Sequence, residues 1–161
     1  MDRAALEREM AALHPRSFGW ALACCRWDRQ EAEDVLQTAY LKLLEGRARF
    51  GERATFKTFL FAVIRKTAAD RRRRKLVATL GLLRLKARTG AAPDPTVPVH
   101  PDVLRIRAAL SALAARQREV LDLVFYHDLT IEQAALVMGV SLGAARVHYE
   151  RGKKRLAERL R

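Results

Sequence analysis

Basic side chains are concentrated in a stretch near the C-terminal end of the sequence, where they could bind nucleic acid. The stretch, EQAALVMGVSLGAARVHYERGKKRL, spans positions 132–156. The start of its second predicted helix, from Ser141 through Leu142 to Arg146, could enter a major groove, where a guanidinium can donate to a guanine edge. The side chains expected to lie beside phosphates are His148, Arg151, Lys153, Lys154 and Arg155. Phosphate contacts would position the protein on DNA and make binding sensitive to salt.

Capping and corner residues predict the two helices that must hold these basic side chains. Thr130 can cap a first helix, with Glu132 and Gln133 in its first turn, close to a capping-box arrangement. Gly139 permits a tight corner because glycine tolerates positive φ, and Ser141 can cap the second helix. The pattern predicts a helix-turn-helix whose second helix faces outward. The positions expected to face inward are Ala134, Ala135, Met138, Val140 and Ala145.

A basic helix end has a simpler interpretation as solvated surface, where Lys and Arg suit the helix dipole. The order of capped helix, glycine corner and second capped helix favours DNA binding over that alternative. The net charge of +13 over 161 residues indicates a polyanionic partner, and an RNA-binding protein or an acidic membrane surface fits that charge equally. The N-terminal residues do not form a signal-peptide pattern, and no apolar run approaches the roughly 18 residues of a membrane span. We therefore expect a soluble, cytoplasmic protein without membrane insertion.

Residues for metal binding or catalysis are not grouped in this sequence. Cys24 and Cys25 are adjacent in the apolar run FGWALACC, so we expect buried, inert thiols and no disulfide between them. The four histidines are scattered and do not complete a zinc site. The sequence contains no Ser/His/Asp set and no phosphate-binding glycine loop, so we expect neither a cofactor nor an enzymatic activity. The histidines are His14, His100, His127 and His148.

Helical periodicity runs through nearly the whole chain and predicts an all-α fold. Two small helical domains, residues 1–88 and 102–161, are predicted on either side of a proline-rich linker at 89–101. Pro15 is expected to interrupt the first helix, Asp28 to cap the second and Thr55 to cap the third. The predicted helices are 3–13, 16–26, 29–45, 56–74, a weaker stretch at 76–88, 102–113, 116–126, 131–138 and 142–159.

The N-terminal domain carries two charge patterns that point to different partners. The helix at 29–45 is acidic, which suits either a basic protein partner or simple solvation, and the local pattern does not separate these interpretations. The following loop and helix interleave arginines with aromatic rings, a pattern that suits single-stranded nucleic acid. A structural alternative is that Phe56, Phe59 and Phe61 are core. Because their spacing does not place them on one face, we expect at least one to be buried and at least one to lie near the loop.

Three motifs in order resemble the extracytoplasmic-function sigma factors, a class of bacterial transcription initiation factors of the sigma-70 family. The first is EAEDVLQTAYLKLL, the second is RFGERATFKTFLFAVIRKTAADRRRR, and the third runs from LAARQREVLDL to the end of the basic helix. Together they cover about two thirds of the chain. The resemblance implies an alternative sigma factor that binds core RNA polymerase and directs initiation at particular promoters.

The resemblance also implies roles for individual residues. The stretch expected to bind the coiled coil of the polymerase β′ subunit contains Glu33, Asp34, Gln37 and Lys42. The residues expected to capture and melt the −10 element are Arg49, Phe50, Arg53, Phe56, Phe59, Arg65 and Lys66. The segment from Ser141 to Arg155 matches the reader of the −35 element. The implied partners are promoter DNA, the β′ coiled coil and β flap of the polymerase and, as in many relatives, an anti-sigma factor.

Two alternatives to a sigma factor, a stand-alone DNA-binding regulator and a nuclease, make different predictions. A stand-alone regulator would read DNA through the C-terminal helix-turn-helix and dimerise through its N-terminal helices, which predicts a stable dimer and pseudo-palindromic sites. A sigma factor is instead expected to be a monomer whose specific binding depends on polymerase. A nuclease would require a metal or acid–base constellation that the sequence does not contain.

Overall fold

A computed structural model describes residues 1–51, 53–81 and 100–161, and these fall into two compact units, one on each side of residues 82–99. Within those ranges the regular secondary structure is helical and there is no strand, which confirms the predicted all-α class. Each unit has its own buried apolar core. The units are described separately below.

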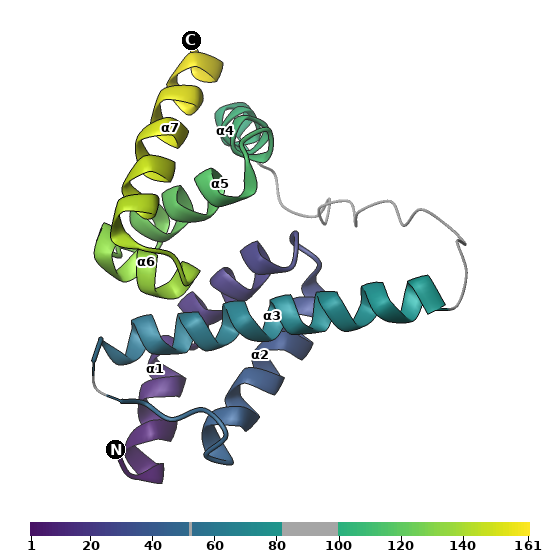
Figure 1. The fold of residues 1–161 in the computed structure, drawn as a ribbon, viewed down its shortest axis with the longest axis vertical. Helices are drawn as coiled ribbons and strands as arrows, with labels where there is room; N and C mark the ends of the chain where they lie inside the picture. The colour runs from purple at the N-terminus through teal and green to yellow at the C-terminus, as the bar shows by residue number, and fades with distance from the viewer. Residues whose placement is uncertain (52, 82–99) are drawn as a thin grey trace. The chain divides into compact units, whose positions relative to one another are not determined.

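The N-terminal unit packs three helices against one another (Figure 1): α1 (Arg3–Cys24), α2 (Arg29–Leu44) and α3 (Phe56–Gly81). Trp20 of α1 is almost completely buried, and its ring stacks on Phe61 of α3 with centroids 5.8 Å apart. The indole nitrogen donates to the Phe61 carbonyl oxygen at 3.0 Å, which satisfies the polar end of a buried tryptophan. The other fully buried side chains around this pair include Ala21, Ala32, Val35, Ala39, Leu60 and Ile64.

The first helix is continuous from Arg3 to Cys24, so the predicted break at Pro15 is wrong. Proline fixes a φ that a helix accepts, and it removes one amide donor from the helical ladder. The cost is offset here because residues on both sides of Pro15, including Met10 and Trp20, are buried against the rest of the unit. Tertiary packing therefore overrides the local signal.

The turn between α1 and α2 ends the first helix two residues earlier than predicted. Arg26 and Trp27 have φ values of 54° and 64°, a left-handed conformation that cannot continue a right-handed helix. Asp28 then caps α2, as predicted, by accepting a hydrogen bond from the Glu31 amide at 3.1 Å. The bounds of α2 agree with the predicted helix at 29–45 to within one residue.

The thiols of Cys24 and Cys25 lie just before this turn and are half-buried, which corrects the expectation of full burial. They form no disulfide, as expected for neighbours in the chain. Burial, reinforced by the nearby Glu31 carboxylate, raises the pKa of Cys25 to about 11. Cys25 is therefore protonated at neutral pH and is a poor nucleophile, consistent with an inert thiol.

The third helix extends to Gly81, beyond the predicted end near residue 74. Thr55 acts as its cap, since its hydroxyl oxygen accepts from the Thr58 amide at 3.2 Å. The C-terminal part of α3 projects past α1 and α2 (Figure 1), and residues 72–81 are exposed. The weaker helical prediction for 76–88 thus holds as far as Gly81, and its remainder lies outside the described residues.

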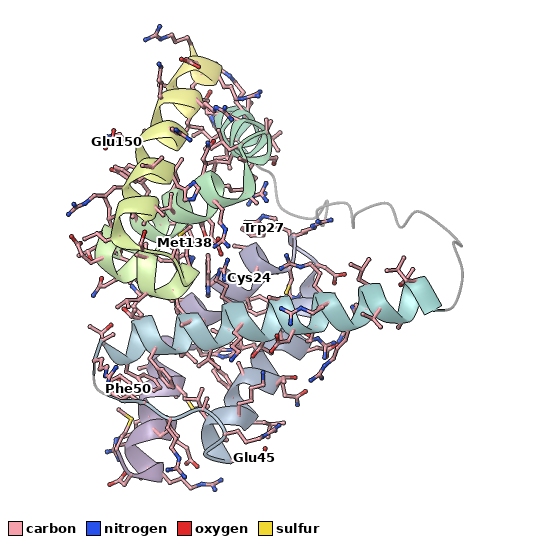
Figure 2. The ribbon with its side chains drawn as sticks, in the orientation of Figure 1. Cys24, Trp27, Glu45, Phe50, Met138 and Glu150 are labelled. Carbon is pink, nitrogen blue, oxygen red and sulfur yellow. The ribbon has the colours of Figure 1, made fainter. Side chains whose placement is uncertain are left out.

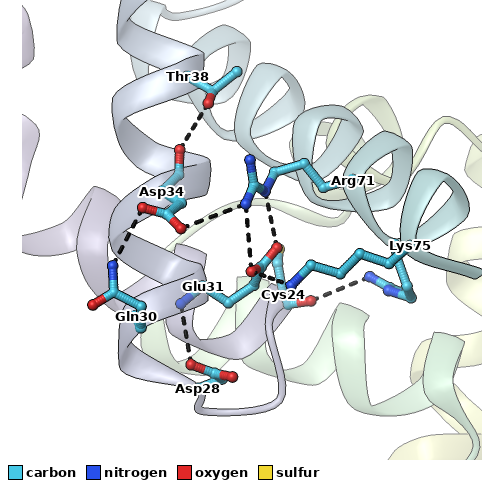
Figure 3. A network of polar contacts seen from close by, with 9 residues as sticks. Cys24, Asp28, Gln30, Glu31, Asp34, Thr38, Arg71 and Lys75 are labelled. Carbon is cyan, nitrogen blue, oxygen red and sulfur yellow. Dashed lines mark hydrogen bonds and ion pairs between the residues drawn. The ribbon is translucent and has the colours of Figure 1, made fainter. Parts of the chain in front are cut away.

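An ion network joins the acidic helix α2 to the basic part of α3 (Figure 3). Arg71 donates from Nε to Glu31 Oε1 at 2.9 Å, and it also contacts Asp34 Oδ2 at 3.5 Å. Lys75 forms a second ion pair with Glu31. The hydrogen bond from Arg71 lowers the pKa of Glu31, and the same bond raises the pKa of Arg71. The network favours the charged forms of Glu31 and Arg71 and joins α3 to α2.

The C-terminal unit contains α4 (Pro101–Ser111), α5 (Ala115–Leu121), the π-helical turn η1 (Asp122–Tyr126), α6 (Ile131–Met138) and α7 (Leu142–Leu160). The predicted linker at 89–101 extended too far, because His100 caps α4 and Pro101 opens it, as proline often does at a first helical position. Residues 89–99 lie outside the described part of the chain. The predicted helix at 116–126 is correct in place, but its second half is the wider η1 turn.

Close packing of α7 on α5 depends on Gly152, which is buried in the C-terminal unit. A Cβ atom at this position would lie 3.1 Å from Leu121 Cδ1 and 3.2 Å from Gln117 Cβ. These distances are shorter than ordinary contacts, so the absence of a side chain allows the two helices to approach. Sequence analysis did not assign a role to Gly152.

Candidate nucleic-acid and protein interfaces

The predicted helix-turn-helix is present between Thr130 and Leu160. Thr130 and Gln133 form a full capping box: the Gln133 amide donates to Thr130 Oγ1 at 3.1 Å, and the Thr130 amide donates to Gln133 Oε1 at 2.9 Å. Gly139 has a φ of 66°, which places it in the left-handed conformation that the corner requires. Ser141 caps α7 by accepting from the Ala144 amide at 3.1 Å. The predicted caps and corner are therefore confirmed.

One face of α7 is buried, and the rest is available to a ligand. Ala145 and Gly152 of α7 face the core. Ala134, Ala135 and Met138 of α6 are also buried, so these three and Ala145 lie as predicted. Val140 is half-buried, and Val137 joins the core although it was not predicted there. Figure 2 shows Glu150 projecting from α7 on the side away from α4 and α5. The exposed basic residues of α7 are Arg146, Arg151, Lys153, Lys154 and Arg155 and, near its C-terminal end, Arg159.

Two of these basic side chains have partners within the unit. Arg146 Nη2 lies 3.6 Å from Glu132 Oε1 of α6. The Lys153 ammonium lies 4.8 Å from the ring centroid of Tyr149, which itself stacks on Phe125 at 6.0 Å. Ser141 is exposed, whereas Leu142 and His148 are half-buried, so these two contribute less surface than the basic residues do.

A three-ring cluster joins the loop before α3 to the start of that helix. Phe50 of the loop, labelled in Figure 2, lies 5.7 Å from Phe56 and 5.4 Å from Phe59 between ring centroids. Phe56 and Phe61 are buried, while Phe50 and Phe59 are half-buried. The expectation that the phenylalanines divide between core and loop is confirmed.

Cationic side chains occur in the same loop as Phe50 and further along α3. Arg49 and Arg53 of the loop and Lys66 of α3 are exposed, and Arg65 is half-buried. The cluster gives the loop a fixed apolar base, and the arginines remain at its surface. Partly exposed rings and exposed cations on one loop and helix are the side-chain types that suit an unstacked base and its phosphate.

An open groove of about 410 Å³ lies between α1 and α2. Glu33 and Gln37, both predicted to bind polymerase, line it and are exposed. The structure adds residues that sequence analysis did not select, and the remaining lining residues are His14, Phe18, Arg29, Leu36 and Tyr40. The signal that could have found them is the alternation of aromatic and polar side chains at helical spacing on α1 and α2.

Contacts inside this groove hold its polar side chains in place. Arg29 Nε lies 3.4 Å from Glu33 Oε1, and its guanidinium carbon is 5.7 Å from the Phe18 ring centroid. His14 Nδ1 and the Tyr40 hydroxyl are 3.1 Å apart. Burial raises the pKa of Tyr40, so its hydroxyl stays protonated at neutral pH. The groove therefore combines polar and charged side chains with the apolar side chains of Phe18 and Leu36.

The other two predicted polymerase contacts turn toward the protein itself. Asp34 accepts from Gln30 Nε2 at 3.3 Å and contacts Arg71, as Figure 3 shows. Lys42 donates to Thr67 Oγ1 of α3 at 3.0 Å. Both residues connect α2 to neighbouring side chains, so a substitution at either position changes the bundle as well as any docking surface.

The described residues also bear on metal binding and on membrane insertion. Among the described residues no three His, Cys, Asp or Glu side chains gather where a metal ion could bind. None of the described helices is both long and apolar enough to cross a lipid bilayer.

Comparison with known proteins identifies the class to which this fold and these surfaces belong. Residues 10–76 match the family description "Sigma-70 region 2", and residues 104–156 match "Sigma-70, region 4". The chain is 32% identical to the ECF RNA polymerase sigma factor SigF of Caulobacter vibrioides over 162 aligned positions, which cover 99% of this chain and 88% of that protein. It is 28% identical to the ECF sigma factor SigX of Bacillus subtilis, over 83% of this chain and 72% of that one.

Solved structures show the same fold. The sigma factor RpoE of Bartonella quintana, in complex with the anti-sigma factor NepR, has a TM-score of 0.72 at 23% identity and covers 96% of this chain and 95% of that chain. CnrH, in complex with the cytosolic domain of CnrY, has a TM-score of 0.66 at 19% identity, covering 99% and 89%. The chain belongs to the extracytoplasmic-function sigma factors of the sigma-70 family.

Membership in this family establishes the general function. The protein is an alternative sigma factor, which binds core RNA polymerase and directs promoter-specific initiation of transcription. It is an initiation factor and not an enzyme.

Proposed function

We propose a division of labour between two domains, with residues 1–88 binding polymerase and opening the −10 element and residues 102–161 reading the −35 element. The observation that carries the second role is that the five basic side chains predicted to contact DNA, from Arg146 to Arg155, are all exposed on α7 after a capped corner. Ser141, Leu142 and Arg146 lie at the end of α7 that would enter the major groove. Arg151, Lys154 and Arg155, with Lys153 and His148 at the flanks, lie where phosphates would run.

The −10 element is assigned to the loop and first turns of α3. The half-buried rings of Phe50 and Phe59 offer apolar surface to a base that has left the stack, and Phe56 supports them from the core. Arg49, Arg53 and Lys66 supply positive charge for the single-stranded backbone, and Arg65 adds to it. Binding unstacked bases would offset part of the cost of opening, on the order of a few kcal/mol per base.

The groove between α1 and α2 is proposed to bind the coiled coil of the β′ subunit. Glu33 and Gln37 are exposed polar residues of its lining, and Phe18 and Leu36 are apolar ones. We assign Asp34 and Lys42 an indirect part, through the shape of α2. On the C-terminal domain, the exposed rings of Phe125 and Tyr126 in η1 support a contact with the β flap. Polymerase works in the cytoplasm, and we place the protein there.

An anti-sigma factor is a further proposed partner. RpoE, whose fold this chain shares, is bound to the anti-sigma factor NepR in its solved complex, and CnrH is bound to the cytosolic domain of CnrY. The exposed apolar residues at the end of α3, Leu76, Val77 and Leu80, support the proposal because they would be covered by such a partner.

Run-off transcription with core polymerase and a genomic fragment library tests the proposal as a whole. We expect discrete transcripts from a subset of fragments, each requiring both proteins, and a monomeric sigma factor in gel filtration without core enzyme. A stable dimer that occupies pseudo-palindromic DNA without polymerase, together with no transcript from any fragment, would contradict it. That result would favour the stand-alone regulator instead.

A further inference from the structure

The ion pair between Arg146 and Glu132 joins the two helices of the helix-turn-helix. Arg146 Nη2 of α7 lies 3.6 Å from Glu132 Oε1 of α6. Each side chain is 60% exposed, so both charged groups remain accessible to DNA. Glu132 occupies the first turn of α6, where the helix dipole favours a carboxylate. A negative charge is thus held beside the guanidinium that is assigned to a base edge.

We propose that Glu132 is a positioning residue for promoter reading, which orients Arg146 toward a base edge and restrains it from phosphates. The inference rests on the proposed role of Arg146 in reading the −35 element. An unrestrained arginine has many rotamers, and its guanidinium binds phosphates of any sequence. A carboxylate that engages one side of the guanidinium leaves its other N–H donors available, and part of the ordering cost is met before DNA arrives.

The charge of Glu132 adds a second source of specificity. The exposed cations of α7, among them Lys154 and Arg155, attract any duplex regardless of sequence. A carboxylate close to that surface repels phosphates. It therefore weakens every complex in which the sugar–phosphate backbone of DNA lies next to Arg146. Specificity that is obtained in this way comes from disfavouring the wrong complexes as well as from favouring the right one.

The pair is exposed, and exposed ion pairs contribute little to fold stability. Its expected effect is therefore on selectivity. We expect loss of the carboxylate to reduce discrimination at one base pair by about threefold. That is the change in affinity that corresponds to the free energy of an ordinary exposed ion pair. Binding to unrelated duplex should increase, because the released guanidinium gains a phosphate. The slope of log affinity against log salt should then become steeper by about 0.9.

A double-mutant cycle on the holoenzyme tests the proposal. Full-length protein is combined with core polymerase and a promoter duplex randomised across the −35 element, and a promoterless duplex of equal length measures non-specific binding. The variants are Glu132→Gln, Arg146→Ala and the double substitution. Glu158→Gln is the control, because it removes the same charge from an exposed site at the far end of α7.

The proposal expects Glu132→Gln to lose discrimination only at the base pair that Arg146→Ala affects, and to add nothing in the Arg146→Ala background. Glu158→Gln should retain full discrimination. Unchanged discrimination in Glu132→Gln, or a loss spread evenly over all positions, would overturn the inference while leaving the role of Arg146 intact. If Arg146→Ala itself leaves every −35 preference unaltered, the proposed reading residue is wrong, and the inference fails with it for that separate reason.

Discussion

Arg71 of α3 donates from Nε to Oε1 of Glu31 in α2 at 2.9 Å, and this contact connects the basic helix to the acidic one. Lys75 approaches the same carboxylate one turn further along α3. Glu31 therefore carries two cationic partners while its side chain keeps only 17% of its surface exposed. This carboxylate therefore links α2 to two successive turns of α3.

Glu31→Gln should destabilise the N-terminal unit by about 1.5–3 kcal/mol, the usual value for hydrogen bonds to a charged group. The pKa of Glu31 is lowered from an unfolded value of about 4.5, so its contribution is present above that pH and is lost as pH falls through the folded pKa. Urea unfolding at pH 7 and at pH 3 measures both effects. The wild-type advantage over Glu31→Gln should shrink at pH 3, and an equal difference at both pH values would contradict the ion network.

Gly152→Leu should destabilise the C-terminal unit by roughly 1–3 kcal/mol, because extra side-chain atoms would force α7 away from α5. The close approaches to Leu121 and Gln117 leave no space for them. Gly143→Ala is the matched control on the same helix, since nothing lies within 4 Å of a Cβ placed there. The control should be neutral or slightly stabilising, as alanine favours helix over glycine. Thermal unfolding of both variants checks the pair, and equal stability would contradict the packing role.

Glu33→Lys should weaken binding to core polymerase by reversing the charge at the groove between α1 and α2. The ion pair that it breaks with Arg29 is exposed and contributes little to folding, so stability should change by less than about 1 kcal/mol. Glu9→Lys provides the same charge change at an exposed position of α1 outside the groove lining. Competition against another sigma factor for core enzyme measures the affinity. Equal losses in both variants would indicate a general charge effect instead of a docking site.

Phe59→Ala should slow promoter opening while leaving polymerase binding intact, because the ring belongs to the loop cluster and is only half-buried. Permanganate reactivity of unpaired thymines near the −10 element measures opening. A template with a pre-opened bubble should restore most of the activity if the defect lies in strand separation. Phe61→Ala is the structural comparison: it removes the buried partner of Trp20 and should cost about 3–5 kcal/mol of stability. Failure of the bubble to restore activity would assign Phe59 to another step.

Lys154→Ala should weaken duplex binding to all promoter sequences alike and should reduce the steepness of the salt dependence by about 0.9. Lys154 is exposed on the outward face of α7, whereas Lys153 is held over the Tyr149 ring. Filter binding of the wild-type and Lys154→Ala holoenzymes across a salt series gives the two slopes. An unaltered slope in Lys154→Ala would place this side chain away from phosphates.

Local signals in the sequence were sufficient for the features that depend on neighbouring residues. The caps at Asp28, Thr130 and Ser141 and the left-handed corner at Gly139 each require only a few adjacent positions. The all-α class followed from apolar periodicity, and the family followed from three motifs in order. The caps and the corner could be predicted because the interactions that form them span no more than four residues.

Tertiary structure alone decided which predicted residues are available to a partner. Asp34 and Lys42 have the residue types of a docking surface, but contacts with Arg71 and Thr67 turn them toward α3. The helix through Pro15, the meeting of His14 and Tyr40 in one groove, and the pairing of Arg146 with Glu132 were also not predicted from the sequence. Each depends on residues far apart in the chain, and which side chains meet there is settled by how the helices pack, because burial of their apolar faces outweighs local preference.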